Sequence, residues 1–569
     1  MRLINTTTCL FEEFIGRHIP KYAILSHTWE EEEVSFKDMS DPSRNNKKGY
    51  RKIEMTCQMA SRAGLSYAWI DTCCIDKSSS AELTEALNSM YRWYQRSDIC
   101  YAFLADLPVS ASLDTALKSC RWFTRGWTLQ ELIAPEDIHF FDQDWNNRGS
   151  KRDLVEVLSR ITGINASVLR HQQRLSSVAV AQKMSWAAHR ETTRIEDTAY
   201  CLLGLFDVNM PLLYGEEEKA FRRLQEEIIK STADYSIFAW RMPSTPRNTK
   251  GPKARVFCGI LAETPLAFAG CTSFIREPNN RQGEFSISNK GVKTQVQIRS
   301  APIPGKHASR YVLPLDCSWP LGKLLGVNLR MCVPDQFIRE DPWNLVKYTE
   351  RFFPNAPRER YLLTELPEMN VGPDYQIWDM SLFIAKTRSH VLQVSLPLEM
   401  RIYDAWPWNR FDDEDQLFFV CGDLRWDSCA LKLCANYTSV GRRDTKIEFV
   451  CMFYAVGWSA LDLGRLQCTL VDYRSFTTEL NEVQSQIAAW DHDRPQVLEQ
   501  LVYHKIPRSA TAAFRIRGTK TSTLVSFTPT LVSDPSICQN KFWRVEFSCE
   551  VYEDENLPQT HRENWIVGE

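Results

Sequence analysis

The chain has 569 residues, of which 44% are hydrophobic and 24% are charged. This composition is that of a globular protein and excludes a disordered or fibrous one, and the length predicts two to four domains, because one hydrophobic core rarely serves so long a chain. The formal net charge is −3 with both signs mixed along the sequence, so we expect neither nucleic acid nor an anionic membrane as a partner.

The amino-terminal segment does not have the pattern of a signal peptide. Glu12 and Glu13 fall where such a peptide needs an apolar stretch, so we expect a protein that is not secreted and is cytoplasmic. No window reaches about 18 apolar residues free of charge, so we also expect no transmembrane helix.

The cysteines and the common ligand motifs narrow the chemistry. None of the 18 cysteines forms a CxxC pair and HExxH is absent, so we expect no zinc site and no other metal site. The patterns GxxxxGKS/T and GxGxxG are also absent, which excludes the common nucleotide-driven switches within this chain.

Short apolar runs and amphipathic segments alternate over the first 145 residues. A capping box of Ser79 and Glu82 opens one of the amphipathic segments. The patterns predict strands at 22–25, 67–71, 99–104 and 138–142, and helices at 50–65, 80–98 and 128–134. This alternation predicts an α/β fold on a parallel sheet with right-handed crossovers.

The rest of the chain divides into a helical and a β-rich part. Residues 193–208 are predicted to form one helix whose buried face carries Ile195, Ala199, Leu202 and Phe206, and other helices are predicted at 153–164, 178–190 and 215–231. Pro- and Gly-containing residues 241–255 predict a linker. Beyond it, alternating patterns predict a hairpin over 285–298 and strands at 446–456, 522–532 and 543–553.

These patterns give the predicted domain organisation. We expect an α/β domain over 1–148, a helical connector over 149–240, and β-rich domains over 255–400 and 401–569, or one β-rich unit that spans the last two ranges.

Candidate binding residues come directly after the predicted strands. Ligands of open parallel sheets bind beyond the carboxyl ends of the strands. In this sequence polar residues follow each predicted strand, and Asp106 and Asp142 are among them. Nearby tryptophans can stack on a flat ring. The candidate ligand-binding residues are Ser26, His27, Trp29, Asp71, Cys74, Asp76 and Trp127.

Three blocks carry a resemblance to a known family. "YAILSHTWEEEEVSF", "GYRKIEMTCQMASRAGLSYAWIDTCCIDKSSSAELTEALNSMYRWYQRSDICYAFLADL" and "FTRGWTLQELIAP" resemble successive blocks of the heterokaryon incompatibility (HET) domain of filamentous fungi, over roughly residues 20–145. The segment "RIEDTAYCLLGLFDVNMPLLYGEEEKAFRRLQEEI" resembles the region on the carboxyl-terminal side of the domain in many such proteins. The family often has glycine after "HTW", where this chain has Glu30, so the loop after the first strand is expected to differ.

HET domains are in turn distantly similar to TIR domains. "GWTLQEL" is similar to the Trp-x-x-x-Glu-Leu helix of TIR domains, and in enzymatic TIR domains that glutamate serves NAD glycohydrolysis. The resemblance therefore implies a TIR-like domain with NAD as substrate and Glu131 as the catalytic residue. Cleavage of the nicotinamide–ribose bond develops oxocarbenium character, which a carboxylate stabilises.

Each of these residues also has a structural interpretation. Thr128 and Glu131 satisfy the capping-box pattern themselves, and Trp122 and Trp127 suit a core. His27 suits a hydrogen-bonded strand end, and Asp71 a residue that fixes a loop. Similarly, Cys74 suits a buried thiol, and residues 30–33 suit a solvated face or a helix start rather than a metal site.

The resemblance implies an effector of non-self recognition, a form of fungal innate immunity that leads to incompatibility and regulated cell death. NAD hydrolysis by the HET domain is the enzymatic hypothesis. The alternative is a non-catalytic signalling module that self-associates or binds a partner protein, with the β-rich half as sensor.

Overall fold

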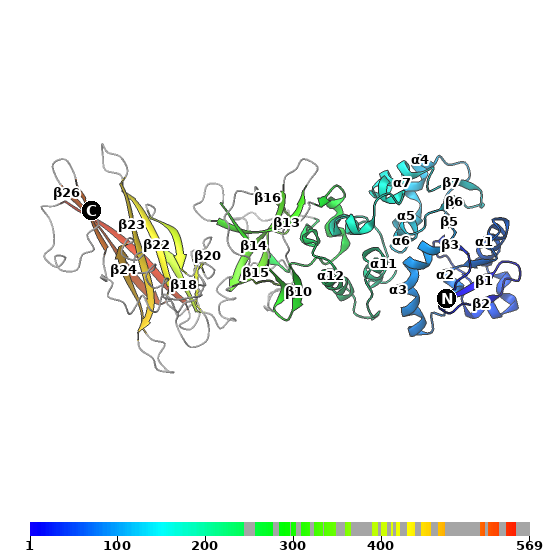
Figure 1. Cartoon of the computed structure of the whole chain (residues 1–569), viewed down its shortest axis with the longest axis horizontal. Helices are drawn as coiled ribbons and strands as arrows, with labels where there is room; N and C mark the ends of the chain where they lie inside the picture. Colours follow the sequence, from blue (N-terminus) through cyan, green and yellow to red (C-terminus); the bar gives the residue numbers. More distant parts are fainter. Residues whose placement is uncertain are drawn as a thin grey trace.

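The computed structural model describes residues 1–243 except 17. Beyond these it describes residues 257–276, 284–295, 298–302, 309–318, 324–333, 335–348, 359–365, 390–396, 400–406, 411–412, 417–420, 429–437, 445–456, 465–472, 512–517, 522–533 and 542–553. The molecule is elongated, with an α/β region at one end, two β-sheets at the other and a further sheet between them (Figure 1).

The N-terminal sheet is mixed, with strand order β2-β1-β4-β3-β5-β6-β7. Its four inner strands pair in parallel and are β3 (Ala23–His27), β4 (Tyr67–Trp69), β5 (Ile99–Phe103) and β6 (Ile138–Phe141). Antiparallel strands flank them: β1 (Arg2–Asn5), β2 (Phe11–Glu13) and β7 (Asn147–Ser150). The predicted α/β class is confirmed, but the prediction of a parallel sheet holds only for the inner strands, because β1, β2 and β7 are too short and too polar to give a clear pattern.

Helices connect the inner strands as the periodic patterns predict. The three predicted helices are α1 (Tyr50–Arg62), α3 (Ser80–Arg96) and α6 (Thr128–Ile133). Short elements that were not predicted are α2 (Asp71–Cys74), α4 (Leu113–Ala116), α5 (Arg121–Thr124), η1 (Lys37–Ser40), η2 (Pro42–Asn46) and η3 (Leu117–Ser119).

The predicted capping box of α3 is only half formed. The Ser79 hydroxyl accepts from the Glu82 backbone N–H, as predicted. The Glu82 carboxylate turns instead to Arg2, 2.8 Å away, and to the backbone N–H of Asp76. An ion pair to β1 therefore replaces the reciprocal bond, and it ties the start of α3 to the edge of the sheet.

The connector consists mostly of short helices. Its elements are α7 (Val155–Thr162), α8 (Ala166–Leu169), η4 (Leu175–Ser177), α9 (Val180–Ser185), α10 (Asp197–Tyr200), α11 (Leu203–Phe206), α12 (Lys219–Ser231) and η5 (Tyr235–Phe238). The prediction of a single helix over 193–208 is wrong, because this segment forms two separate helical turns, α10 and α11. Ala199, Leu202 and Phe206 are buried as predicted, but Ile195 is exposed. Packing of α11 against α3 outweighs the helical periodicity of this segment.

Three sheets make up the described part of the C-terminal half. The first contains β8 (Phe257–Cys258), β9 (Ile275–Arg276), β10 (Phe285–Ser288), β11 (Gly291–Thr294), β12 (Arg299–Pro302), β13 (Ser309–Ser318), β14 (Leu324–Val333), β15 (Gln336–Glu340), β16 (Val346–Tyr348) and β17 (Arg360–Leu362), next to η6 (Pro265–Cys271). The second contains β18 (His390–Ser395), β20 (Phe411–Asp412), β21 (Leu417–Val420), β25 (Ala512–Arg517), β26 (Ser522–Ser533) and β27 (Phe542–Glu553). The third contains β19 (Met400–Trp406), β22 (Cys429–Tyr437), β23 (Thr445–Val456) and β24 (Arg465–Asp472).

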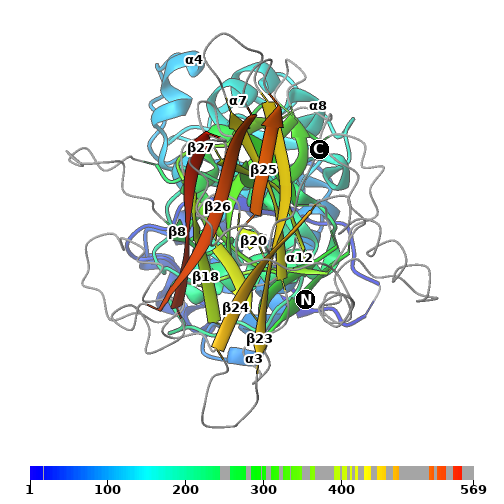
Figure 2. The same cartoon turned by 90° about the vertical axis from the view of Figure 1, so that its left-hand side faces the viewer.

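The β-rich half has the predicted pattern. β10 and β11 form the predicted hairpin with Ser288 opposite Gly291, and β23, β26 and β27 match the three predicted strands. β23 and β24 contact β25 and β26, so the last two sheets lie against each other (Figure 2). Residues 244–255 of the predicted linker lie outside the described residues. Within the part of the chain that is described, no helix is long and apolar enough to cross a membrane.

Gly204 gives a direct test of the contact between α11 and α3. A Cβ at this position would overlap the Tyr91 side chain, so Gly204→Ala is expected to lower stability by about 1–3 kcal/mol through overpacking. The measurement is the shift of the urea unfolding transition, with Ser61→Ala at an exposed position of α1 as the control. An unchanged transition for Gly204→Ala would contradict the close approach of the two helices.

Candidate functional site

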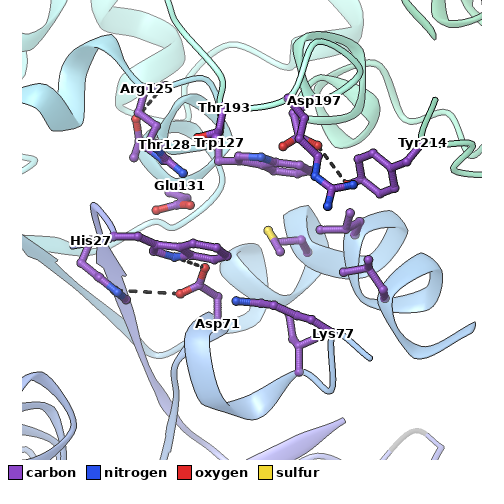
Figure 3. A pocket seen from close by; sticks show the side chains of 16 residues that line it. His27, Asp71, Lys77, Arg125, Trp127, Thr128, Glu131, Thr193, Asp197 and Tyr214 are labelled. Carbon is purple, nitrogen blue, oxygen red and sulfur yellow. Dashed lines mark hydrogen bonds and ion pairs between the residues drawn. The ribbon is translucent and has the colours of Figure 1, made fainter. Parts of the chain in front are cut away.

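A cavity lies at the carboxyl ends of the inner strands. Along the sheet the inner strands follow the order β4-β3-β5-β6. β4 therefore lies on one side of β3, whereas β5 and β6 lie on the other, and the direction of winding changes between β3 and β5. Ligands of open α/β sheets bind at such a switch point. A cavity of about 270 Å³ opens at this edge of the sheet, next to the switch point, between the ends of β3 and β4, α3, α6 and the connector (Figure 3).

The structure brings most of the predicted site residues to this cavity. His27, Trp29, Asp71, Trp127 and Glu131 line it. Ser26 lies directly behind Glu131 and is fully buried.

Two predicted residues do not reach the cavity. Cys74 is buried, its thiol lies 3.4 Å from the Ile70 backbone N–H, and it fits the interpretation of a structural thiol. Asp76 accepts hydrogen bonds from the backbone and hydroxyl of Ser78 and so stabilises the turn before α3. Both come after the second strand in sequence, but α2 carries them past the rim.

Glu131 is held by a buried hydrogen-bond chain. The Trp122 indole N–H donates to the Ser26 hydroxyl at 2.7 Å, and that hydroxyl donates to the Glu131 carboxylate. We call this the Trp122–Ser26–Glu131 chain. Burial, together with the nearby Asp71 carboxylate, raises the pKa of Glu131 to about 8 although the hydrogen bond from Ser26 opposes the rise. Free Glu131 is therefore mostly protonated at neutral pH.

The capping-box interpretation of Glu131 is wrong. Thr128 lies inside α6 and its hydroxyl donates to the Trp122 and Arg125 carbonyls, while Trp127 precedes the helix without a side-chain cap. Arg190 of the connector donates to both the Thr128 hydroxyl and the Arg125 carbonyl. The start of α6 is thus fixed by Thr128 and Arg190, which leaves the Glu131 carboxylate to Ser26 and the cavity.

Trp122 and Trp127 differ in role. Trp122 is fully buried and packs edge-on against Phe123 and Phe140, so the core interpretation is confirmed for it. Trp127 is only partly buried and lines the cavity.

His27 is buried without a hydrogen-bond partner among the described residues. Its Nε2 atom lies 3.8 Å from the Glu33 carboxylate and its Nδ1 atom lies 3.9 Å from the Asp71 carboxylate. Both distances are too long for hydrogen bonds. Burial and the Lys52 charge lower its pKa to about 3, so the ring is neutral. The interpretation as a hydrogen-bonded structural histidine therefore does not hold.

Asp71 fixes the indole of Trp29. The Trp29 N–H donates to the Asp71 carboxylate at 2.8 Å, and the Lys77 ammonium lies 3.5 Å from the centre of the same ring. Trp29 is 39% exposed, so one end of this stack opens to solvent.

The expected solvated face of residues 30–33 is confirmed for residues 30–32, which are exposed, whereas Glu33 is half-buried. The Glu33 carboxylate lies 2.5 Å from the Lys52 ammonium, which also lies 3.0 Å from the Glu30 carboxylate. Glu30, at the position where the family often has glycine, therefore takes part in an ion-pair cluster. Among the described residues, no three His, Cys, Asp or Glu side chains are grouped as metal ligands.

One wall of the cavity comes from the connector and was missed in the sequence. Thr193, Arg194, Asp197 and Tyr214 line it. The Tyr214 hydroxyl donates to Asp197 at 3.0 Å (Figure 3). The Arg194 guanidinium carbon lies 4.3 Å from the Tyr214 ring centre. No strand-end rule points to these residues. The only signal was the resemblance of their segment to the region on the carboxyl-terminal side of HET domains.

Comparisons with known proteins match separate segments of the chain. Residues 22–119 match the family described as heterokaryon incompatibility protein (HET), and residues 219–265 match a domain of unknown function, DUF8212. The chain is a HET-domain protein. It is 48% identical over 256 residues to the vegetative incompatibility protein HET-E-1 of Podospora anserina.

The extent of these matches is limited. The alignment with HET-E-1 covers 43% of this chain and 19% of that protein, so the chain spans about a fifth of the length of its relative. The HET match ends at residue 119, before α5 and α6, so Glu131 lies beyond it. No solved structure matches the chain.

The raised pKa of Glu131 predicts a pH-dependent gain of stability in Glu131→Gln. Between pH 4.5, where the unfolded group ionises, and about 8, the folded state holds a proton that the unfolded state has lost. Stability of the native protein therefore falls as pH rises through this window, and a neutral amide removes that loss. The free energy of unfolding of Glu131→Gln, relative to that of the native protein, should therefore increase by on the order of 2 kcal/mol or more from pH 5 to pH 8.

Thermal unfolding at both pH values measures this gain. Glu136→Gln is the control, since Glu136 is exposed on the same segment and lies outside the cavity. An equal change in stability by Glu131→Gln at pH 5 and at pH 8 would show that the pKa of Glu131 is not raised in the folded protein.

Proposed function

We propose that this protein is an effector of heterokaryon incompatibility whose N-terminal region, a TIR-like domain acting in the cytoplasm, hydrolyses NAD and so leads to regulated cell death. The role in incompatibility is supported by the HET match and by the name of the relative. The reaction is supported by one observation above all. A buried carboxylate, fixed by Ser26, faces a cavity that also carries the indoles of Trp29 and Trp127.

The geometry suits cleavage of an N-glycosidic bond. The bond between the nicotinamide nitrogen and the ribose carbon breaks, and its electron pair leaves with neutral nicotinamide. The Glu131 carboxylate stabilises the positive charge that develops on the ribose. Water then adds to that carbon and releases a proton. Nicotinamide is a good leaving group, so the cavity needs no second carboxyl group as an acid.

Ligand charge and Glu131 are coupled in this scheme. The nicotinamide ring of NAD carries a positive charge, which favours the ionised form of a carboxyl group beside it. The substrate itself therefore lowers the pKa of Glu131, and the carboxylate forms where it is needed. The partly buried indole of Trp127 offers a face on which a cationic or flat ring stacks.

The test is nicotinamide release from NAD by the purified full-length chain. Glu131→Gln and Glu131→Ala are expected to lower the rate by about 100-fold or more, since they remove the transition-state charge. Glu136→Gln, on the exposed side of the same segment, should release nicotinamide like the native protein. Release that persists in both Glu131 variants would refute the mechanism, and no release by the native chain in any oligomeric state would favour the non-catalytic signalling module.

A pH profile gives a second, independent measurement. Because free Glu131 is protonated below about pH 8, kcat/KM should rise as pH increases toward 8 and then level off. A profile that is flat between pH 6 and 8 would mean that Glu131 ionisation does not limit the reaction. Initial rates at low NAD concentration measure kcat/KM directly.

A further inference from the structure

Three cationic side chains converge on the cavity without a close ion pair to any described residue. Lys77, Arg125 and Arg194 all line it, and none of them makes an ion pair or a side-chain hydrogen bond with any described residue. They come from three separate parts of the chain: the loop before α3, the turn between α5 and α6, and the connector. Lys77 and Arg125 approach the cavity from opposite sides (Figure 3).

These cations are held in place by aromatic rings. The Lys77 ammonium lies 3.5 Å from the centre of the Trp29 ring, and the Arg125 guanidinium carbon lies 5.9 Å from the same ring. Arg194 lies 4.3 Å from the centre of Tyr214. Aromatic contact restricts a long side chain but does not neutralise its charge. The charges are thus positioned in advance, which lowers the entropy cost of binding an anion.

The acidic residues of the cavity do not balance them. Asp71 accepts from the Trp29 N–H and Asp197 accepts from the Tyr214 hydroxyl, and neither carboxylate is within ion-pair distance of the three cations. Glu131 keeps its proton at neutral pH. The three cations therefore face at most two ionised carboxylates, and the neutral ring of His27, which has no hydrogen bond to any described residue, adds no charge.

We infer that Lys77, Arg125 and Arg194 form an anion subsite that binds the diphosphate group of a nucleotide, with Arg194 supplied by the connector. This inference rests on the proposed function, which supplies the class of ligand. What it adds is that the chain recognises the diphosphate group of that ligand. The anionic group lies toward the mouth, where Lys77 and Arg194 are exposed, and the ring that is cleaved lies toward Glu131. The HET match alone contains only Lys77 of the three.

The experiment compares a ligand that carries the diphosphate and a second ribose with one that carries neither, and the salt dependence isolates the contribution of the charged diphosphate. Isothermal titration of the full chain with ADP-ribose and with adenosine measures binding without any reaction. ADP-ribose should bind at least about tenfold more tightly than adenosine, and increasing salt should weaken only ADP-ribose, because the contacts are charged and partly exposed.

Variants then assign the contacts. Arg194→Ala and Lys77→Ala should each weaken ADP-ribose by about five- to tenfold and leave adenosine unchanged, whereas Arg194→Lys should retain most of the affinity. Arg62→Ala, at the exposed end of α1 and outside the cavity, is the matched control. Unfolding temperatures check that each variant is folded.

The result separates this inference from the proposed reaction. Equal affinity for ADP-ribose and adenosine, or unchanged ADP-ribose affinity in both Arg194→Ala and Lys77→Ala, would overturn the anion subsite even if nicotinamide is released. Phosphate-dependent binding that needs Arg194, in a protein that releases no nicotinamide, would support the subsite and refute NAD hydrolysis.

Discussion

The candidate site depends on the Trp122–Ser26–Glu131 chain. It joins residues that are about a hundred positions apart in the sequence, at the end of β3, in α5 and in α6. Because the Trp122 N–H occupies the Ser26 oxygen, the Ser26 hydroxyl hydrogen is directed to Glu131. This hydrogen bond offsets part of the free-energy cost of burying the Glu131 carboxyl group. It also fixes the carboxyl oxygen at the inner end of the cavity.

Asp142 shows that this arrangement is not a requirement of the fold. It comes after β6 at the same edge of the sheet and is fully buried, yet its carboxylate accepts from the backbone of Asp144 and Asn146 and from Arg148. The fold can therefore satisfy a buried strand-end acid completely. Among the described residues, Glu131 has no cation within ion-pair distance and His27 has no hydrogen bond, so both are held in environments that stability alone does not explain.

The range of the interactions decides how much of the structure could be predicted from the sequence. α1, α3 and the inner strands have clear periodic patterns, and their strand-end residues His27, Trp29 and Asp71 meet as the topology predicts. The mixed character of the sheet and the break between α10 and α11 depend on contacts distant in sequence, which no local pattern encodes. The partner of Glu131 was ambiguous for the same reason: a capping box and a buried hydrogen bond to Ser26 share the same local sequence.

The connector wall completes the cavity and links it to the β-rich half. Arg190 fixes the start of α6, and α10, which carries Asp197, packs against α12. α12 in turn contacts β10, and the Gln225 amide exchanges two hydrogen bonds with the backbone of Ala262. The described part of the segment that matches the second family, which contains α12 and β8, thus joins the cavity wall to the first β-sheet. Residues 22–119 by themselves supply Trp29, Asp71 and Lys77 but neither Glu131 nor the wall, so the site belongs to the assembled α/β region and connector rather than to the matched HET segment alone.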